Sequence, residues 1–91
     1  MIDHVVLLQP KTEVTEEEIT RVLSHVQGLQ ETIPGIAETR VGKNPSPNVY
    51  GFVMRFVDVE HLKAYAPHPA HQVVSQELQD ICQNIIDFDI L

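Results

Sequence analysis

The stretch Ile2-Asp3-His4-Val5-Val6-Leu7-Leu8-Gln9 decides the fold of this chain, and Pro10 bounds it. Its centre is apolar at four consecutive positions, a pattern that predicts a strand buried on both faces. Tyr50–Val57 has the same character, with apolar side chains on both faces: Phe52, Met54 and Phe56 on one, Val53 and Val57 on the other. We therefore expect these two strands to lie beside each other in the middle of a sheet.

The remaining elements fall around these two strands. Ile36–Gly42 and Asn84–Leu91 alternate between apolar and charged residues, which is typical of edge strands. Helical spacing predicts three helices: one that starts at a Thr15/Glu18 capping box and ends at Pro34-Gly35, a short one over Val59–Tyr65, and one that Pro69 opens. Gly42–Asn48 is rich in turn-forming residues. The order predicts an α+β, ferredoxin-like βαββαβ unit with an antiparallel sheet in strand order 4-1-3-2.

The two longer helices can cover only one face of such a sheet. The other face would leave several apolar side chains of the central strands in water, and soluble monomers do not tolerate a large contiguous apolar patch. A second copy packed on that face is the simplest cover, so we predict a two-fold homodimer.

Length and composition limit the remaining possibilities. Residues 1–91 are expected to form one domain. The 13 Asp and Glu residues against 6 Lys and Arg give a net charge of −7, which disfavours nucleic acid and anionic membranes as partners. The sequence predicts neither a transmembrane segment nor a secretory signal, so we expect a cytoplasmic protein. Cys82 stands alone and is expected to be a small core residue.

The residues best suited to chemistry lie in Tyr65-Ala66-Pro67-His68-Pro69-Ala70-His71. His71 would occupy the third position of the helix that Pro69 opens, where the helix dipole disfavours the imidazolium. The two prolines could turn the chain so that Tyr65 and His71 meet, one as a proton donor and the other as a base. Alternatively, His71 would bond a loop carbonyl and Tyr65 would only pack its ring, and spacing alone leaves both interpretations open.

The other histidines allow similar alternatives. His4 shares one face of the predicted strand with Ile2, Val6 and Leu8. It therefore lies either in the core that these residues form or in a pocket that they line. His68 and His71 could share a metal ion only with a third ligand, for which His4, on a distant strand, is the sole candidate. We therefore predict neither a metal site nor a cofactor.

The whole chain resembles the stress-responsive α/β barrel family, the Dabb domain. The segments that carry the resemblance are Ile2–Leu7, Ile33–Ile36, Val41–Asn44, Gly51–Phe56, Tyr65 with His68-Pro69-Ala70-His71, and Ile86–Asp89. The resemblance implies a ferredoxin-like unit that dimerises sheet to sheet into an α/β barrel. It also implies, in some members, a cation held by main-chain oxygens near the end of the first helix.

Within this family the chain resembles the plant polyketide (olivetolic acid) cyclase group, which closes linear polyketides by aldol condensation without a cofactor. The resemblance implies that His71 is the base, that Tyr65 binds the carbonyl or returns a proton, and that His4 lies near them. His68, Tyr50 and Phe52 would also line the pocket. Tyr50 replaces a histidine of the cyclases and Phe52 an aliphatic residue, and these rings disfavour a long alkyl chain.

These observations predict a small dimeric protein with one hydrophobic pocket per subunit. The pocket would support cofactor-free acid–base catalysis, of the cyclase or isomerase type, on a carbonyl or polyketide-like compound. The alternative is a non-catalytic protein of the same fold, related to stress or to ligand binding. A heme- or flavin-free monooxygenase of the wider dimeric barrel group agrees less well with the His-Pro-Ala-His element.

Overall fold

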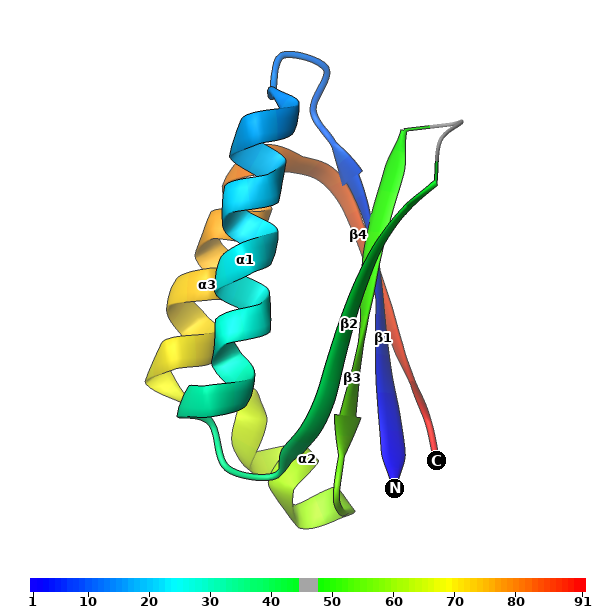
Figure 1. The fold of residues 1–91 in the computed structure, drawn as a ribbon, viewed down its shortest axis with the longest axis vertical. Coiled ribbons are helices and arrows are strands. Elements are labelled where there is room, and N and C mark those ends of the chain that lie inside the picture. The colour runs from blue at the N-terminus through cyan, green and yellow to red at the C-terminus, as the bar shows by residue number, and fades with distance from the viewer. Residues whose placement is uncertain (45–47) are drawn as a thin grey trace.

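The computed structural model describes residues 1–44 and 48–91. Its elements are β1 (Ile2–Pro10), α1 (Glu16–Thr32), β2 (Ile36–Asn44), β3 (Val49–Phe56), α2 (Val59–Tyr65), α3 (Pro69–Ile81) and β4 (Cys82–Ile90). The strands form one antiparallel sheet in the order β2-β3-β1-β4, as predicted. The helices α1 and α3 lie on one side of it and leave the other side bare (Figure 1). The ferredoxin-like βαββαβ fold is confirmed.

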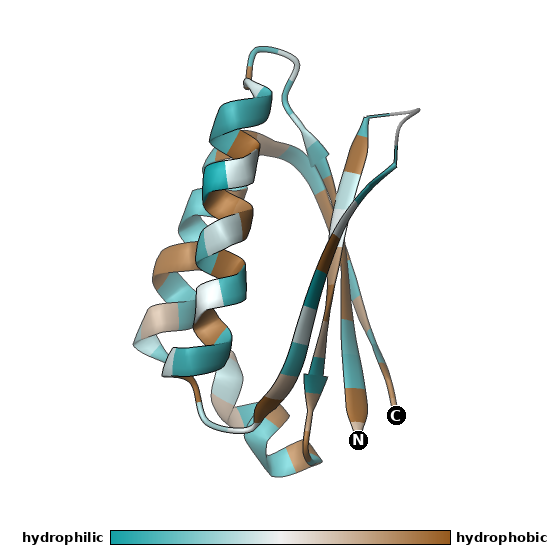
Figure 2. Ribbon diagram, viewed as in Figure 1, coloured by the Kyte–Doolittle hydropathy of each residue, from teal (hydrophilic) through white to brown (hydrophobic). Residues whose placement is uncertain are grey.

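The capping box predicted for the first helix is present in α1. The hydroxyl of Thr15 accepts a hydrogen bond from the backbone N–H of Glu18 at 3.2 Å, and the Glu18 carboxylate accepts one from the Thr15 N–H at 3.3 Å. The helix buries the predicted stripe, which consists of Ile19, Val22, Leu23, Val26 and Leu29. The brown bands on the inner side of α1 in Figure 2 follow this stripe.

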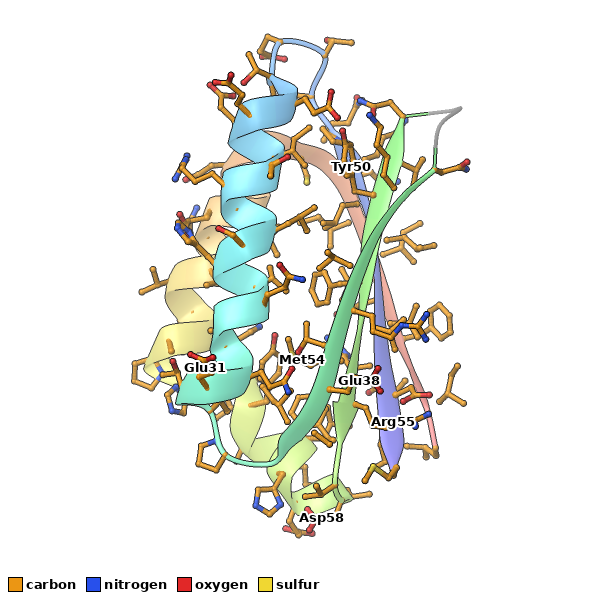
Figure 3. All side chains as sticks on the ribbon, in the orientation of Figure 1. Glu31, Glu38, Tyr50, Met54, Arg55 and Asp58 are labelled. Atoms are coloured by element: carbon orange, nitrogen blue, oxygen red, sulfur yellow. The ribbon has the colours of Figure 1, made fainter. Side chains whose placement is uncertain are left out.

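Strand pairing divides the side chains of the sheet between its two faces. His4 of β1 lies opposite Met54 of β3, and both point to the helix side, where Met54 is completely buried. Figure 3 shows Met54 directed at the helices, whereas Glu38 and Arg55 lie toward the other face. The core is therefore built between the helices and one face of the sheet.

The opposite face, which we call the open face, exposes apolar side chains. Leu7 on β1 is 43% exposed, and Phe88 on the edge strand β4 is 50% exposed. Within a single chain the first strand is therefore buried on its helix side alone, since no helix or strand of residues 1–44 and 48–91 covers the other side, and this is the exposed apolar face that the sequence predicted. Figure 2 shows hydrophobic bands on strands whose outer side no helix covers.

The bounds of β2 and β4 differ most from the predicted ones, by two residues at one end of each. β2 continues to Asn44 because Gly42, Lys43 and Asn44 pair with β3, so the turn predicted from Gly42 begins later; its segment 45–47 lies outside the described residues. β4 begins at Cys82 rather than Asn84, since Cys82 pairs with Pro10. Among the described residues, no helix has the length and apolar character needed to cross a bilayer.

Candidate functional site

A cavity of about 300 Å³ lies between the helix side of the sheet and α3. Four of the six predicted site residues line it: His4, Phe52, Tyr65 and His71. The structure adds lining residues that the sequence did not single out, namely Val6, Val74, Ser75, Leu78, Gln79, Ile85 and Asp87. The volume is near the lower end of the range for small-molecule pockets.

Tyr65 and His71 meet across the turn between α2 and α3. Their ring centroids are 4.2 Å apart, and the Tyr65 ring also packs edge-on against Phe56 at 5.1 Å. Tyr65 is the last residue of α2, and its carbonyl accepts a hydrogen bond from the His68 N–H at 3.1 Å, which closes the turn. The Tyr65 side chain is therefore held by packing against both of these rings.

The environment of Tyr65 keeps its phenol neutral. The residue is only 4% exposed, and burial raises the pKa of the Tyr65 hydroxyl above its ordinary value. A neutral phenol is a hydrogen-bond donor, so it can stabilise negative charge on a carbonyl oxygen that reaches it.

His71 is oriented by the same turn. Its Nδ1 lies 2.9 Å from the backbone carbonyl oxygen of Ala66. A carbonyl oxygen accepts but does not donate, so Nδ1 must carry the proton of this bond. In the neutral ring Nε2 then holds a lone pair and can accept a proton. The sequence left open a purely structural interpretation, in which His71 bonds a loop carbonyl. In the structure this same bond also fixes the tautomer that a base needs.

His4 has a partner that sequence reasoning missed. Its Nδ1 lies 2.7 Å from a carboxylate oxygen of Asp89, which sits opposite it on β4. The His4 side chain is 14% exposed, and its ring lies 5.8 Å from that of Tyr65. The sequence does contain one indication of this contact: Asp87 and Asp89 alternate with apolar residues, so both carboxylates lie on one face of β4. Only the register of β4 determines which face that is.

The structure does not bring His68 and Tyr50 into this cavity. Nδ1 of His68 accepts a hydrogen bond from the Ala70 N–H at 3.1 Å, so this side chain caps α3. Tyr50 is buried farther along β3, and the Lys43 ammonium lies 5.4 Å from its ring centroid. Within residues 1–44 and 48–91, no three His, Cys, Asp or Glu side chains are grouped so that they could hold a metal ion.

Comparison with known families agrees with this architecture. The family model of the stress responsive A/B barrel domain matches residues 2–91, essentially the whole chain. The chain belongs to this family. Comparison with the curated proteins finds no match.

Several solved structures resemble this A/B barrel domain over almost its full length. A dimeric ferredoxin-like protein of unknown function from Jannaschia sp. CCS1 is 32% identical, with 99% of this chain and 97% of that chain covered and a TM-score of 0.85. Hydroxynitrile lyase from Passiflora edulis is 16% identical, with 98% and 90% covered and a TM-score of 0.89. SnoaB, a cofactor-independent oxygenase from Streptomyces nogalater, is 11% identical, with 99% and 90% covered and a TM-score of 0.87. At these identities the likeness to the two enzymes shows a common fold and nothing about activity.

Proposed function

We propose that this A/B barrel domain is a cytoplasmic homodimer in which each protomer binds a small, largely hydrophobic carbonyl compound beside Tyr65 and His71 and catalyses cofactor-free proton transfer on it. The hydrogen bond from His71 Nδ1 to the Ala66 carbonyl is the observation that carries the proposal. It leaves Nε2 as the acceptor in a partly buried ring that touches a phenol. The dimer is proposed because the relative that is 32% identical is described as dimeric.

The proposed chemistry begins with a proton on carbon next to the carbonyl group. Nε2 of His71 takes this proton, and the electron pair of the C–H bond moves into the carbonyl as an enolate. The Tyr65 hydroxyl donates a hydrogen bond to the enolate oxygen. In an isomerase-like reaction the imidazolium returns the proton to another carbon. In a cyclase-like reaction the enolate carbon attacks a second carbonyl, and the new alkoxide takes the proton from His71.

The lining of the cavity favours an uncharged ligand. Of the described side chains around it, Asp87 carries a negative charge and none belongs to Lys or Arg. A carboxylate or phosphate would enter without a cation to neutralise it, at a large desolvation cost. We propose that Phe52 and His4 contact the ligand, whereas Tyr50 and His68 support the fold around it.

Hydrogen exchange on a simple ketone tests the proposal. Acetophenone is added to the wild-type protein in D₂O, and NMR follows both the histidine ring signals and the loss of the methyl protons. We expect the His71 signals to shift and deuterium to enter the methyl group, with benzoate giving no shift. His71→Ala should slow the exchange by about 10²–10⁴-fold. His25→Ala serves as the control, since His25 lies on the outer surface and binds Glu77 at 2.9 Å.

A non-catalytic ligand-binding protein of the same fold is the alternative. It is favoured by the same bond to Ala66, which would also hold His71 as a purely structural residue. Acetophenone binding at His71 without any exchange above the His71→Ala level would support this alternative and refute the catalytic proposal. Failure of every neutral carbonyl compound in a panel to perturb His4 or His71 would refute both.

A further inference from the structure

The cavity beside Tyr65 and His71 has a polar side that the proposed proton transfer does not use. His71, Ser75 and Gln79 follow one another at intervals of four residues on α3, so they share one face of the helix, and all three line the cavity. Asp87 lines the same cavity from β4. Ser75 is half-buried and Asp87 is exposed, so these polar groups lie where the cavity meets water. We call Ser75, Gln79 and Asp87 the polar wall.

Ser75 and Asp87 lie at the same level of the cavity. The helix α3 and the strand β4 run in opposite directions (Figure 1, yellow to orange and orange to red). Asp89 marks the level of His71, because it binds His4 and both histidines pack against the same tyrosine ring. Asp87 is two strand residues back from Asp89, a displacement of about 6.6 Å. Ser75 is four helical residues on from His71, a displacement of about 6 Å in the same direction.

The polar wall has hydrogen-bonding capacity that the described residues leave unused. The Gln79 amide donates to the Ser75 hydroxyl at 3.1 Å, so the Ser75 O–H remains able to donate. Within residues 1–44 and 48–91, Asp89 is paired with His4, whereas no cationic side chain lies within ion-pair distance of the Asp87 carboxylate. A carboxylate only accepts hydrogen bonds. The wall therefore offers a ligand one charged acceptor and one hydroxyl donor.

We infer that the cavity selects carbonyl compounds that carry a hydroxyl group about one helical turn from the carbon that faces His71, and that Asp87 determines this specificity. The inference rests on the proposed function and names its substrate class. A hydroxyl group can donate to Asp87 and accept from Ser75, whereas an ether oxygen only accepts and a hydrocarbon end does neither. A ligand that covers Asp87 without a donor displaces water from the carboxylate and leaves it unpaired, which costs affinity.

Three ketones with the same carbonyl end test the inference: acetophenone, 4-hydroxyacetophenone and 4-methoxyacetophenone. Their para position lies about one helical turn from the methyl carbon, which matches the spacing of the polar wall from His71. Dissociation constants are measured from the His71 NMR signals in mildly acidic solution, where the phenol of the hydroxy compound is neutral. We expect this compound to bind the wild-type protein about 10-fold more tightly than either of the other two.

Asp87→Ala removes the charged acceptor, so the three ketones should then bind with affinities within about twofold of one another. Asp87→Asn keeps a neutral acceptor and should give an intermediate preference. Asp80→Ala is the matched control, because the Asp80 carboxylate is also exposed near the junction of α3 and β4, but it binds Gln76 at 2.9 Å and does not line the cavity. This control should keep the wild-type preference. Circular dichroism confirms that each variant is folded.

The pH dependence of binding provides a second readout. When the phenol of 4-hydroxyacetophenone ionises, the phenolate meets the Asp87 carboxylate, so the wild-type protein should lose its preference for this compound. Asp87→Ala should lose less affinity over the same pH range. These losses are compared with those of the methoxy compound, which does not ionise.

Equal binding of the hydroxy and methoxy compounds by the wild-type protein would overturn the inference. It would also be overturned if Asp87→Ala kept the preference, or if Asp80→Ala lost it to the same extent. Deuterium exchange into the methyl group is scored separately. Preferential binding of the hydroxy compound at His71 without exchange would refute the catalytic proposal and leave the specificity of Asp87 standing, whereas exchange without any preference would refute the inference alone.

Discussion

The imidazole of His71 donates its Nδ1 proton to the carbonyl oxygen of Ala66 across 2.9 Å, while its ring lies 4.2 Å from the ring of Tyr65. The backbone therefore selects the tautomer of a side chain that faces the cavity. This relationship involves no ligand and can be examined in the free protein.

We predict that neutral His71 is found as the Nδ1–H tautomer. Free imidazole side chains prefer the other tautomer, so the carbonyl of Ala66 must impose this one. Nitrogen-15 chemical shifts of the two ring nitrogens distinguish the tautomers directly, above the pH at which the ring loses its second proton. Signals typical of a protonated Nε2 would contradict the geometry at this residue.

We predict that Asp89→Ala releases the ring of His4. The carboxylate, 2.7 Å from His4 Nδ1, accepts a hydrogen bond from that atom and fixes the ring. Without it, the nitrogen-15 shifts of His4 should move toward a mixture of tautomers, and acetophenone should bind more weakly. Asp87→Ala is the control, because Asp87 lies opposite Val6 rather than His4. Equal effects of the two variants on His4 would show that general charge, rather than the contact, is responsible.

The buried phenol predicts a loss of stability in alkaline solution. Because burial raises the pKa of Tyr65, the folded protein keeps this proton at a pH where the unfolded chain releases it. Below about pH 10, the ordinary tyrosine pKa, both states keep the proton and this loss of stability is absent. Above that pH the unfolded chain releases the proton first, so the free energy of unfolding falls as the pH rises. Tyr65→Phe should reduce this slope in denaturant titrations between about pH 9 and pH 11. An identical slope in both proteins would exclude Tyr65 as its source.

Two glycines should respond oppositely to the same substitution. Gly35 has a φ of 91°, and a Cβ atom there would come within 2.3 Å of the His61 ring. Gly35→Ala should therefore lower the free energy of unfolding by about 1–3 kcal/mol. Gly28→Ala, inside α1 with open space around it, should raise it by about 0.5–1 kcal/mol. Chemical denaturation measures both, and equal effects would contradict the difference in backbone conformation.

The elements that the sequence predicted well are those whose signal is local. The capping box of Thr15 and Glu18 and the apolar stripe that follows are spaced by helix geometry alone. The double-sided apolar character of β1 and β3 placed them in the centre of the sheet. Tyr65 and His71 could be predicted to meet because only a short, proline-bounded turn separates them.

The parts that were missed depend on contacts between distant segments. Asp89 lies 85 residues from His4, and only the register of β1 with β4 brings them together. Tyr50 shares a face with Phe52, but two residues along a strand move a side chain by about 6.6 Å, enough to leave the cavity. His68 precedes a proline, which holds it in the extended conformation of an N-cap rather than turning it toward His71.

The irregularity at the start of β4 has a consequence for how this protein can change. Gln9 pairs with Asn84 and Pro10 with Cys82, so Gln83 is an extra residue there, and its amide donates to the Pro10 carbonyl at 3.1 Å. This one extra residue determines which side chains of the rest of β4 face the helices and which face the open side of the sheet. Deleting it would exchange the two sides of the strand, turning the aspartates outward and the phenylalanine inward. Substitutions at the odd positions 85 and 87 of β4 therefore change the lining of the cavity, and substitutions at the even positions 86, 88 and 90 change the open face, whereas a single-codon deletion would alter both faces at once.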